Sequence, residues 1–244
     1  MSESSFWQGK KIVITGGGRR IGAALVRAFA AEGAFVTIHC HTGREEAAAL
    51  LQEIGGPEKR HSLINADLSL PLDAPFWEKI LSGAHLLINN ASLYYRKRAE
   101  EESEEERAEE LAVNYTAPLA LMEIFRKVCG KEDPSIINML DQGIAHADPG
   151  AFSYALSKKM LAEATKACAL SYAPGIRVNA VAPGPMIPPP DLPFSKMEKT
   201  LAKIPLARAV KVEDVVKGVL FLGEAASATG TILTLDGGLS LQGV

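Results

Sequence analysis

The sequence of 244 residues has little cysteine, no cluster of basic residues and no long apolar run. Its three cysteines, Cys40, Cys129 and Cys168, are odd in number and far apart, and no Cys-x-x-Cys pair is present. This spacing argues against both a disulfide framework and a zinc site, so we expect no metal ion. The same cysteine usage favours a reducing, cytoplasmic compartment.

Charge and hydropathy argue against two further classes of protein. The chain carries 26 Lys and Arg residues against 29 Asp and Glu residues, a net charge of −3, and its pI is about 6.0. It therefore lacks the basic patch that gives proteins their affinity for nucleic acid. No segment approaches the roughly 18 consecutive apolar residues of a membrane span, and the first nine residues do not resemble a signal peptide. We expect a soluble protein with neither nucleic acid nor membrane as a partner.

Short apolar runs alternate with segments of helical periodicity along the chain. These patterns predict strands over 11–15, 34–40, 62–66, 85–89, 135–140, 176–182 and 231–235, and helices over 21–32, 45–54 and 154–172. Such alternation predicts the α/β class: a Rossmann-type doubly wound sandwich whose seven-stranded, mostly parallel sheet has helices on both faces. Without a repeat or a flexible linker, residues 1–244 are predicted to form a single dinucleotide-binding and catalytic domain.

Two segments depart from this alternation. The acidic run from Glu100 to Glu106 is interpreted as the solvated face of a helix. The proline-rich stretch from Pro183 to Pro193 follows the sixth predicted strand, and open α/β sheets bind ligands beyond the carboxyl ends of their strands. It is either a substrate loop over about 183–204 or a plain surface connection.

A glycine-rich turn joins the first predicted strand to the first predicted helix. It reads Thr-Gly-Gly-Gly-Arg-Arg-Ile-Gly over residues 15–22. Glycines let the backbone approach a pyrophosphate, and a helix N-terminus offers free N–H groups and a positive dipole end. Glycines also serve tight turns for steric reasons alone. The place of this turn, together with Arg19 and Arg20, favours a dinucleotide site.

The end of the second predicted strand bears on which dinucleotide binds. An acid there would accept hydrogen bonds from a ribose 2′-hydroxyl and repel a 2′-phosphate. The segment instead contains His39, His41, Thr42 and Arg44, with no acid before Glu45. This composition favours NADPH over NADH. Alternatively, the two histidines are strand-end residues without a ligand.

Tyr154 and Lys158 stand four residues apart on a predicted helix and therefore share one face. Tyrosine has a pKa near 10, and a neighbouring ammonium group favours the phenolate. Lowering the pKa to 7 would require about 4 kcal/mol. Such a pair alone is common on amphipathic helices, but Asp141 at the end of the fifth strand and Asn114 add context.

These motifs together resemble the short-chain dehydrogenase/reductase family along nearly the whole chain. The motifs are the glycine loop, Ala66-Asp67-Leu68, Asn89-Asn90-Ala91, Asn114, Tyr154-x-x-x-Lys158, Arg177-Val178-Asn179, Pro183-Gly184 and Asp236-Gly237-Gly238. Two departures point to a subgroup: Arg20 replaces the middle glycine of the loop, and Asp141 replaces the serine that precedes the catalytic tyrosine. With His39-x-His41 and residues 90–95, they resemble pteridine reductases and dihydromonapterin reductases. Pro185 and Met186 stand where those reductases tend to have a serine.

Asp141 bears on the substrate. A serine can donate a hydrogen bond to a carbonyl oxygen that becomes negative, whereas an ionised aspartate would oppose that charge. Reduction of a ring C=N bond needs a proton at nitrogen, which a carboxylic acid with a raised pKa could supply. The alternative is that Asp141 is a structural cap at a strand end.

The resemblance implies a role for each matching residue. Tyr154 and Lys158 would transfer the proton, Asp141 would complete a triad, and Asn114 would orient Lys158 through water. Tyr94 would sandwich a pterin against the nicotinamide, unless it is an ordinary, partly buried aromatic residue. The implied substrate-binding residues are Arg20, Ser92, Tyr94, Asp141 and Tyr154. The implied cofactor-binding residues are Gly16, Arg19, Arg20, Ile21, His39, His41, Thr42, Asp67, Leu68, Asn90, Ala91, Ser92, Met139, Lys158, Pro183 and Gly184.

The leading hypothesis is therefore an NADPH-dependent reductase of pterins or dihydropterins. One alternative is a carbonyl reductase of the same family, acting for example on 3-oxoacyl thioesters, which Asp141 and Tyr94 disfavour. The other is an NADPH-binding regulator without chemistry, which would have no use for a complete set of catalytic residues. The resemblance also implies a homotetramer that associates through the helices expected over 104–129 and 154–172.

Overall fold

The computed structural model describes residues 5–186, 198 and 201–242. Seven strands form one sheet in the order β3-β2-β1-β4-β5-β6-β7, and every neighbouring pair is parallel. The strands are β1 (Lys11–Ile14), β2 (Phe35–Cys40), β3 (Ser62–Asn65), β4 (Leu86–Asn89), β5 (Ser135–Met139), β6 (Arg177–Pro183) and β7 (Ile232–Leu235). The doubly wound parallel sheet predicted from the sequence is confirmed, and each predicted strand matches to within a residue or two at either end.

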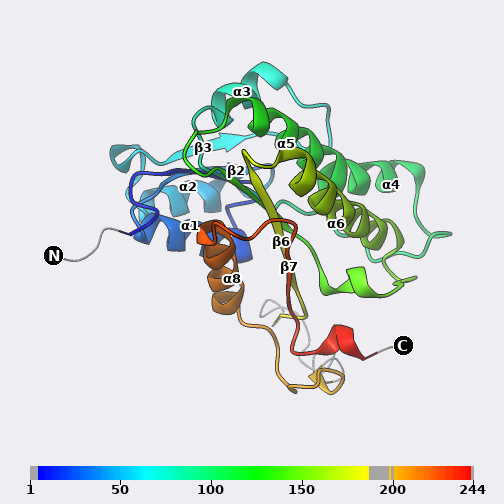
Figure 1. Cartoon of the computed structure of the whole chain (residues 1–244). Helices are drawn as coiled ribbons and strands as arrows, with labels where there is room; N and C mark the ends of the chain where they lie inside the picture. Colours follow the sequence, from blue (N-terminus) through cyan, green and yellow to red (C-terminus); the bar gives the residue numbers. More distant parts are fainter. Residues whose placement is uncertain (1–4, 187–197, 199–200, 243–244) are drawn as a thin grey trace.

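Helices cover both faces of the sheet (Figure 1). On one face lie α1 (Arg20–Ala31), α2 (Arg44–Glu53) and α8 (Val212–Glu224). On the other lie α3 (Ala74–Leu81), α5 (Ala117–Val128) and α6 (Phe152–Tyr172). A further helix, α4 (Glu104–Leu111), packs beside α6 and continues through a π-helical turn, Ala112–Thr116, into α5. Short 3₁₀ turns lie at Pro57–Lys59, Gln142–Ala145 and Leu239–Leu241.

The sequence analysis did not predict α3 and α8. The first has only eight residues, with a proline in its first turn. The second is rich in valine and contains two glycines, Gly218 and Gly223, so its local preference for helix is weak. Val215, Val219 and Leu222 are buried on one side of α8. Tertiary packing of this apolar face therefore stabilises a helix that local propensity does not indicate.

The core has two layers, one on each side of the sheet. Ile12 and Ile14 of β1 point into the layer beneath α1 and α8, whereas Val13 between them points into the layer beneath α5 and α6. Successive side chains of a strand alternate between the faces of a sheet, so a strand buried on both faces is apolar throughout. This explains why the central strands read as continuous apolar runs.

The order of the strands positions the site. The chain moves outward from β1 to β3 and then returns to β4 on the other side of β1. Loops that leave β1 and β4 therefore diverge at their carboxyl ends and open a crevice, where doubly wound sheets bind ligands. No helix in the described part of the chain is long and apolar enough to cross a membrane.

Candidate active site

The glycine loop after β1 fits closely against the start of α1. Gly16 has a positive φ of 60°, and a Cβ atom at Gly22 would overlap the carbonyl oxygen of Gly16. The N-cap residue Arg19 makes no side-chain capping bond, and the first turn of α1 contains no acid. By contrast, Asp73 and Ser103 cap α3 and α4 with their side chains. Since α2, α6 and α8 also lack a side-chain cap, the glycine loop that leads into α1 is what makes this N-terminus suited to an anion such as a pyrophosphate.

Two arginines border this loop. The guanidinium group of Arg19 lies 2.6 Å from a carboxylate oxygen of Glu46, and both side chains are about half exposed. Arg20 begins α1 with a positive φ of 50°, a conformation that is uncommon for a residue with a side chain. Both arginines are exposed at the rim of the loop. Their side chains are therefore accessible to a phosphate group.

The two histidines after the glycine loop have different surroundings. His39 is buried; its Nδ1 accepts a hydrogen bond from the Gly16 N–H at 3.2 Å, and its Nε2 donates to the Ala66 carbonyl at 3.0 Å. Burial lowers the pKa of His39 to about 4 and keeps the ring neutral. His39 therefore shapes the loop and offers no free nitrogen, which differs from the direct cofactor contact expected of it. His41 is exposed and lies 3.6 Å from Asp67.

Asn90 and Thr15 join the carboxyl ends of β4 and β1. The amide of Asn90 donates to the carbonyl oxygens of Thr15 and Gly16, each at 2.9 Å. In return, the Thr15 hydroxyl accepts from the backbone N–H groups of Asn90 and Ala91. These bonds hold the loops that border the crevice at a set separation. Next to them, Asp67 accepts from the backbone and hydroxyl of Ser69, so its carboxylate closes a local turn.

Tyr154, Asp141 and Lys158 meet where β5 ends. The Tyr154 hydroxyl donates to Asp141 Oδ2 at 3.3 Å, while Asp141 Oδ1 accepts from the Gly143 N–H at 2.7 Å. Lys158 is buried and donates to the carbonyl oxygen of Met139 at 3.0 Å. Because Tyr154 and Lys158 lie one helical turn apart on α6, both reach the same side of the crevice.

The protonation of these three groups follows from their burial. Desolvation raises the pKa of Asp141 above the usual value for aspartate, in the direction that the sequence analysis anticipated for a proton donor. Burial and the neighbouring Asp141 raise the pKa of Tyr154 well above 10, so the expected lowering by Lys158 is wrong for this structure. Burial also lowers the pKa of Lys158 to about 8. Lys158 therefore still carries its positive charge for the most part at pH 7 and loses it as the pH rises through about 8.

Asn114 lies in the π-helical turn between α4 and α5 and is fully buried. Its Oδ1 accepts from the Leu93 N–H at 2.9 Å and from the Ser92 hydroxyl at 3.0 Å, and its Nδ2 donates to the Leu93 carbonyl at 2.7 Å. The side chain thus holds the segment after β4. Its expected action on Lys158 through water stays a prediction.

Tyr94 faces Tyr154 across the mouth of the site. The two rings meet edge to face, with their centroids 4.7 Å apart and their planes at 82°. Tyr94 is 51% exposed, so one side of its ring is open to a ligand. An exposed aromatic ring beside the proton donors is suited to stacking on a flat, conjugated ring system.

Two acidic residues near the site were not singled out by the sequence analysis. The Glu102 side chain is only 1% exposed and accepts hydrogen bonds from the backbone and hydroxyl of Ser153, at the start of α6. The interpretation of the acidic run as a solvated face is therefore wrong for Glu102. Glu110 is fully buried and accepts from the Tyr95 N–H. Glu110 could have been recognised from its spacing of four residues from Asn114, which places both on one helix face.

β6 ends at Pro183, and Gly184 follows it directly. The Gly184 N–H donates to the Leu235 carbonyl, and a Cβ atom at Gly184 would press against the backbone of Asp236. Glycine is thus required here because the two segments approach closely. The expected substrate loop, about 183–204, lies for the most part outside the described residues.

The geometry and the motifs agree with comparisons to known proteins. A family model described as enoyl-(acyl carrier protein) reductase matches residues 16–240. The chain belongs to the short-chain dehydrogenase/reductase family. Pteridine reductase 1 of Leishmania tarentolae is 31% identical over an alignment of 276 positions, gaps included. The alignment covers 94% of this chain and 96% of the relative. The 3beta-hydroxysteroid dehydrogenase 1 of Eggerthella lenta is 33% identical and covers 96% of this chain and 95% of its own.

Solved structures of short-chain dehydrogenase/reductase proteins give the same picture. FolM alternative dihydrofolate reductase 1 from Brucella canis, complexed with NADP, superposes with a TM-score of 0.86 at 34% identity and covers 96% of this chain and 95% of that chain. The corresponding protein from Brucella suis, also in complex with NADP, has a TM-score of 0.85 at 33% identity and covers 96% of each chain. These likenesses support the pteridine reductase-like branch of the family.

Proposed function

We propose that this protein is an NADPH-dependent reductase of pterins or dihydropterins. The observation that carries the proposal is the buried Asp141 carboxyl group, which lies 3.3 Å from the Tyr154 hydroxyl. The exposed Tyr94 ring packs edge to face on the Tyr154 ring. The names of two similar proteins, a pteridine reductase and an alternative dihydrofolate reductase, support the same substrate class.

The protonation of Asp141 suits reduction of a ring C=N bond. Hydride addition to the ring carbon leaves negative charge on nitrogen, which must be protonated. Burial raises the pKa of Asp141, so a larger fraction of this group is a neutral acid than for an exposed aspartate. Tyr154, whose pKa lies well above 10, is a second neutral O–H donor within reach. Either group can deliver the proton, and the 3.3 Å contact lets one replenish the other.

The chain also offers groups suited to the cofactor. The bound nicotinamide would supply the hydride. The open N-terminus of α1 would bind the pyrophosphate, and Lys158, next to Met139, would bind the nicotinamide ribose. Arg19, whose guanidinium group lies beside Gly43, would bind a 2′-phosphate together with Arg44 and His41, because no acid stands at the end of β2.

A carbonyl substrate is the second candidate. It is favoured by the similarity to a 3beta-hydroxysteroid dehydrogenase, whose name denotes chemistry at an alcohol carbon. Asp141 opposes it in its ionised form, because a carboxylate beside a developing oxyanion raises the barrier. Turnover with a pterin but not with a ketone would therefore distinguish the two.

The test is NADPH oxidation by the purified protein with a dihydropterin, dihydrofolate or an acetoacetyl thioester as acceptor. We expect turnover with the dihydropterin and its loss in Asp141→Ser. Turnover with the thioester alone, unchanged or improved in Asp141→Ser, would contradict the proposal. A homotetramer is part of the same proposal, and sedimentation equilibrium would test it.

A further inference from the structure

Residues 93–97 lie outside helix and strand, and α4 with the following π-helical turn holds them at Leu93, Tyr95 and Lys97. Tyr95 is held twice, because its hydroxyl also donates to Glu109 of α4 at 2.7 Å. Asn114 pairs with the backbone N–H and carbonyl of Leu93 at 2.9 and 2.7 Å. Glu110 accepts from the backbone N–H of Tyr95. Glu106 pairs with the ammonium group of Lys97 at 2.5 Å. Glu106, Glu110 and Asn114 follow one another at intervals of four residues. Their partners, Lys97, Tyr95 and Leu93, lie at intervals of two.

This pairing has a geometric basis. Four residues of α-helix advance about 6.0 Å, while two residues of extended chain advance about 6.6 Å, so the two repeats nearly match. Residues 106, 110 and 114 share one helix face, and residues 93, 95 and 97 share one side of this segment. The exposure pattern agrees: Leu93, Tyr95 and Lys97 are partly buried, whereas Ser92, Tyr94 and Arg96 are exposed.

The register of this segment decides where Tyr94 points. Shifting an extended chain by one residue turns each side chain to the opposite side. In the observed register Tyr94 faces Tyr154, with 4.7 Å between ring centroids. A shift by one residue would instead direct Tyr94 toward α4 and Tyr95 toward the site. The bond from Tyr95 to Glu110 lies next to Tyr94 in the chain and so acts most directly on this choice.

The far end of the segment is tied to the start of α6. The Lys97 carbonyl accepts from the Phe152 N–H at 3.0 Å, and Glu102 accepts from the backbone of Ser153 at 3.0 Å. Phe152 and Ser153 directly precede Tyr154 in the chain. Tyr94 and Tyr154 are therefore held by one network of hydrogen bonds that starts at α4.

Glu110 is a costly residue for packing alone. It is fully buried, and its Oε2 makes no hydrogen bond of ordinary geometry among the described residues, although the backbone N–H of Tyr154 lies near the carboxylate. Desolvation raises the pKa of Glu110. An apolar side chain would avoid the cost of burying an unpaired polar atom. The acid provides an acceptor for the Tyr95 N–H, which an apolar side chain cannot.

We propose that Glu110 is a positioning residue: by accepting the Tyr95 N–H, it sets the register of residues 93–97 and thereby holds Tyr94 against Tyr154 for stacking on the substrate ring. The consequence for catalysis rests on the proposed function, whereas the register does not. Glu106 and Asn114 set the same register from either side of Glu110.

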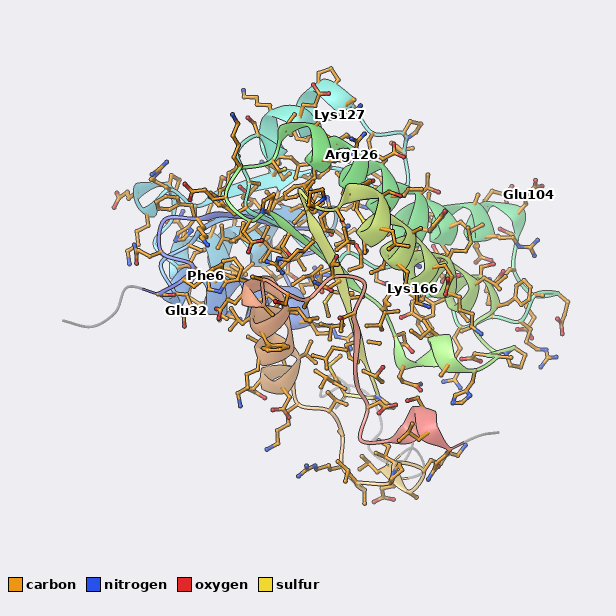
Figure 2. All side chains as sticks on the ribbon, viewed as in Figure 1. Phe6, Glu32, Glu104, Arg126, Lys127 and Lys166 are labelled. Atoms are coloured by element: carbon orange, nitrogen blue, oxygen red, sulfur yellow. The ribbon has the colours of Figure 1, made fainter. Side chains whose placement is uncertain are left out.

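Three variants separate this role from a general loss of stability. Glu110→Leu removes the acceptor, and Glu110→Gln keeps a carbonyl acceptor at the same distance along the side chain. Glu104→Leu makes the first change at an exposed position of the same helix, where Figure 2 shows Glu104 at the outer surface. Should Glu110→Leu not fold, Glu106→Gln weakens the neighbouring point of attachment and takes its place.

The first readout needs no substrate. Hydrogen exchange of peptides spanning Leu93 to Arg98 reports the Tyr95 amide directly. We expect exchange about tenfold to a hundredfold faster in Glu110→Leu, since the hydrogen bond that protects this amide is lost, and near wild-type exchange in Glu110→Gln and Glu104→Leu. Unchanged exchange in Glu110→Leu would overturn the proposed register.

The second readout is kinetic. In Glu110→Leu we expect the KM for the dihydropterin to rise about tenfold while the Kd for NADPH stays within about twofold, because stacking is lost and the glycine loop is untouched. Glu110→Gln should restore the KM. Equal losses of dihydropterin and NADPH binding, not restored by glutamine, would show a merely structural role. If the wild type reduces no dihydropterin, the proposed function fails and the exchange comparison still decides the register.

Discussion

The hydroxyl of Tyr154 donates a hydrogen bond to Asp141 Oδ2 across 3.3 Å, at the point where β5 ends and α6 passes over it. Burial raises the pKa of both groups, which increases the neutral fraction of Asp141 and keeps Tyr154 a neutral phenol. Lys158 is the nearby cation, and burial lowers its pKa to about 8. The site thus places a carboxyl group and a phenol within hydrogen-bond distance of each other, as the proposed reduction of a C=N bond would use them.

Removing either proton donor should stop reduction without preventing cofactor binding. In Asp141→Ala and Tyr154→Phe we expect kcat for the dihydropterin to fall by about 10²–10⁴-fold, the usual contribution of a positioned acid. NADPH affinity, measured by fluorescence titration, should change little, because neither residue contacts the glycine loop. Asp214→Ala is the control, since Asp214 is an exposed acid on α8. Full turnover in both test variants would contradict these roles.

Lys158 should give the activity an alkaline limit. Its pKa of about 8 means that the free enzyme loses this positive charge as the pH rises through 8. We therefore expect kcat/KM for NADPH to decline above about pH 8, as a plot of log kcat/KM against pH would show. Lys158→Met should remove most of the activity, and the remaining activity should show no decline in kcat/KM above pH 8. Lys166→Met, at an exposed position farther along α6 that is labelled in Figure 2, should behave as wild type.

His39 should make the fold less stable in acid. Its pKa is 6.5 when unfolded and about 4 when folded, so between these values the unfolded chain binds more protons. The free energy of unfolding therefore falls as the pH drops from 6.5 to 4, by about 3 kcal/mol from this group. Urea unfolding across this range should show a smaller acid loss in His39→Gln than in wild type. In His41→Gln, at an exposed position, the free energy of unfolding should fall between pH 6.5 and 4 by as much as in wild type.

Arg19 should contribute to selectivity for NADPH. Its guanidinium group pairs with Glu46 on the surface, where such a pair contributes only about 0–1 kcal/mol to stability. Arg19→Ala should raise the KM for NADPH by about tenfold, through loss of a charge-assisted bond to the 2′-phosphate, and leave the KM for NADH unchanged. Glu46→Gln should lower the KM for NADPH, since it frees Arg19. Parallel effects on both cofactors would contradict the assignment.

Much of the fold could be predicted from local patterns. The central strands lie between two helical layers, so Ile12, Val13 and Ile14 are all apolar and read as one buried run. The Val-rich α8 could not be recognised in this way, because its valines favour a strand locally and only packing against β5 and β6 makes it a helix.

Site residues that lie at a characteristic spacing in the sequence could be predicted equally well. Tyr154 and Lys158 meet because four residues span one helical turn, and Asp141 could be placed because a strand ends there. Glu102 and Glu110 were missed, because whether a glutamate is solvated or buried depends on which elements cover it. Here the residues 93–103 and the start of α6 cover both side chains.

The sequence by itself determined where the strands lie, the glycine turn, the Tyr154-x-x-x-Lys158 pair and the aspartate in place of serine, because each is a pattern of neighbouring residues in the chain. Only the tertiary structure decided protonation and register. The pKa values of Tyr154, Lys158 and His39 depend on burial by segments distant in sequence, and Tyr94 faces Tyr154 because a helix face holds residues 93–97. Such effects arise from desolvation and from long-range hydrogen bonds, and no local pattern encodes either of them.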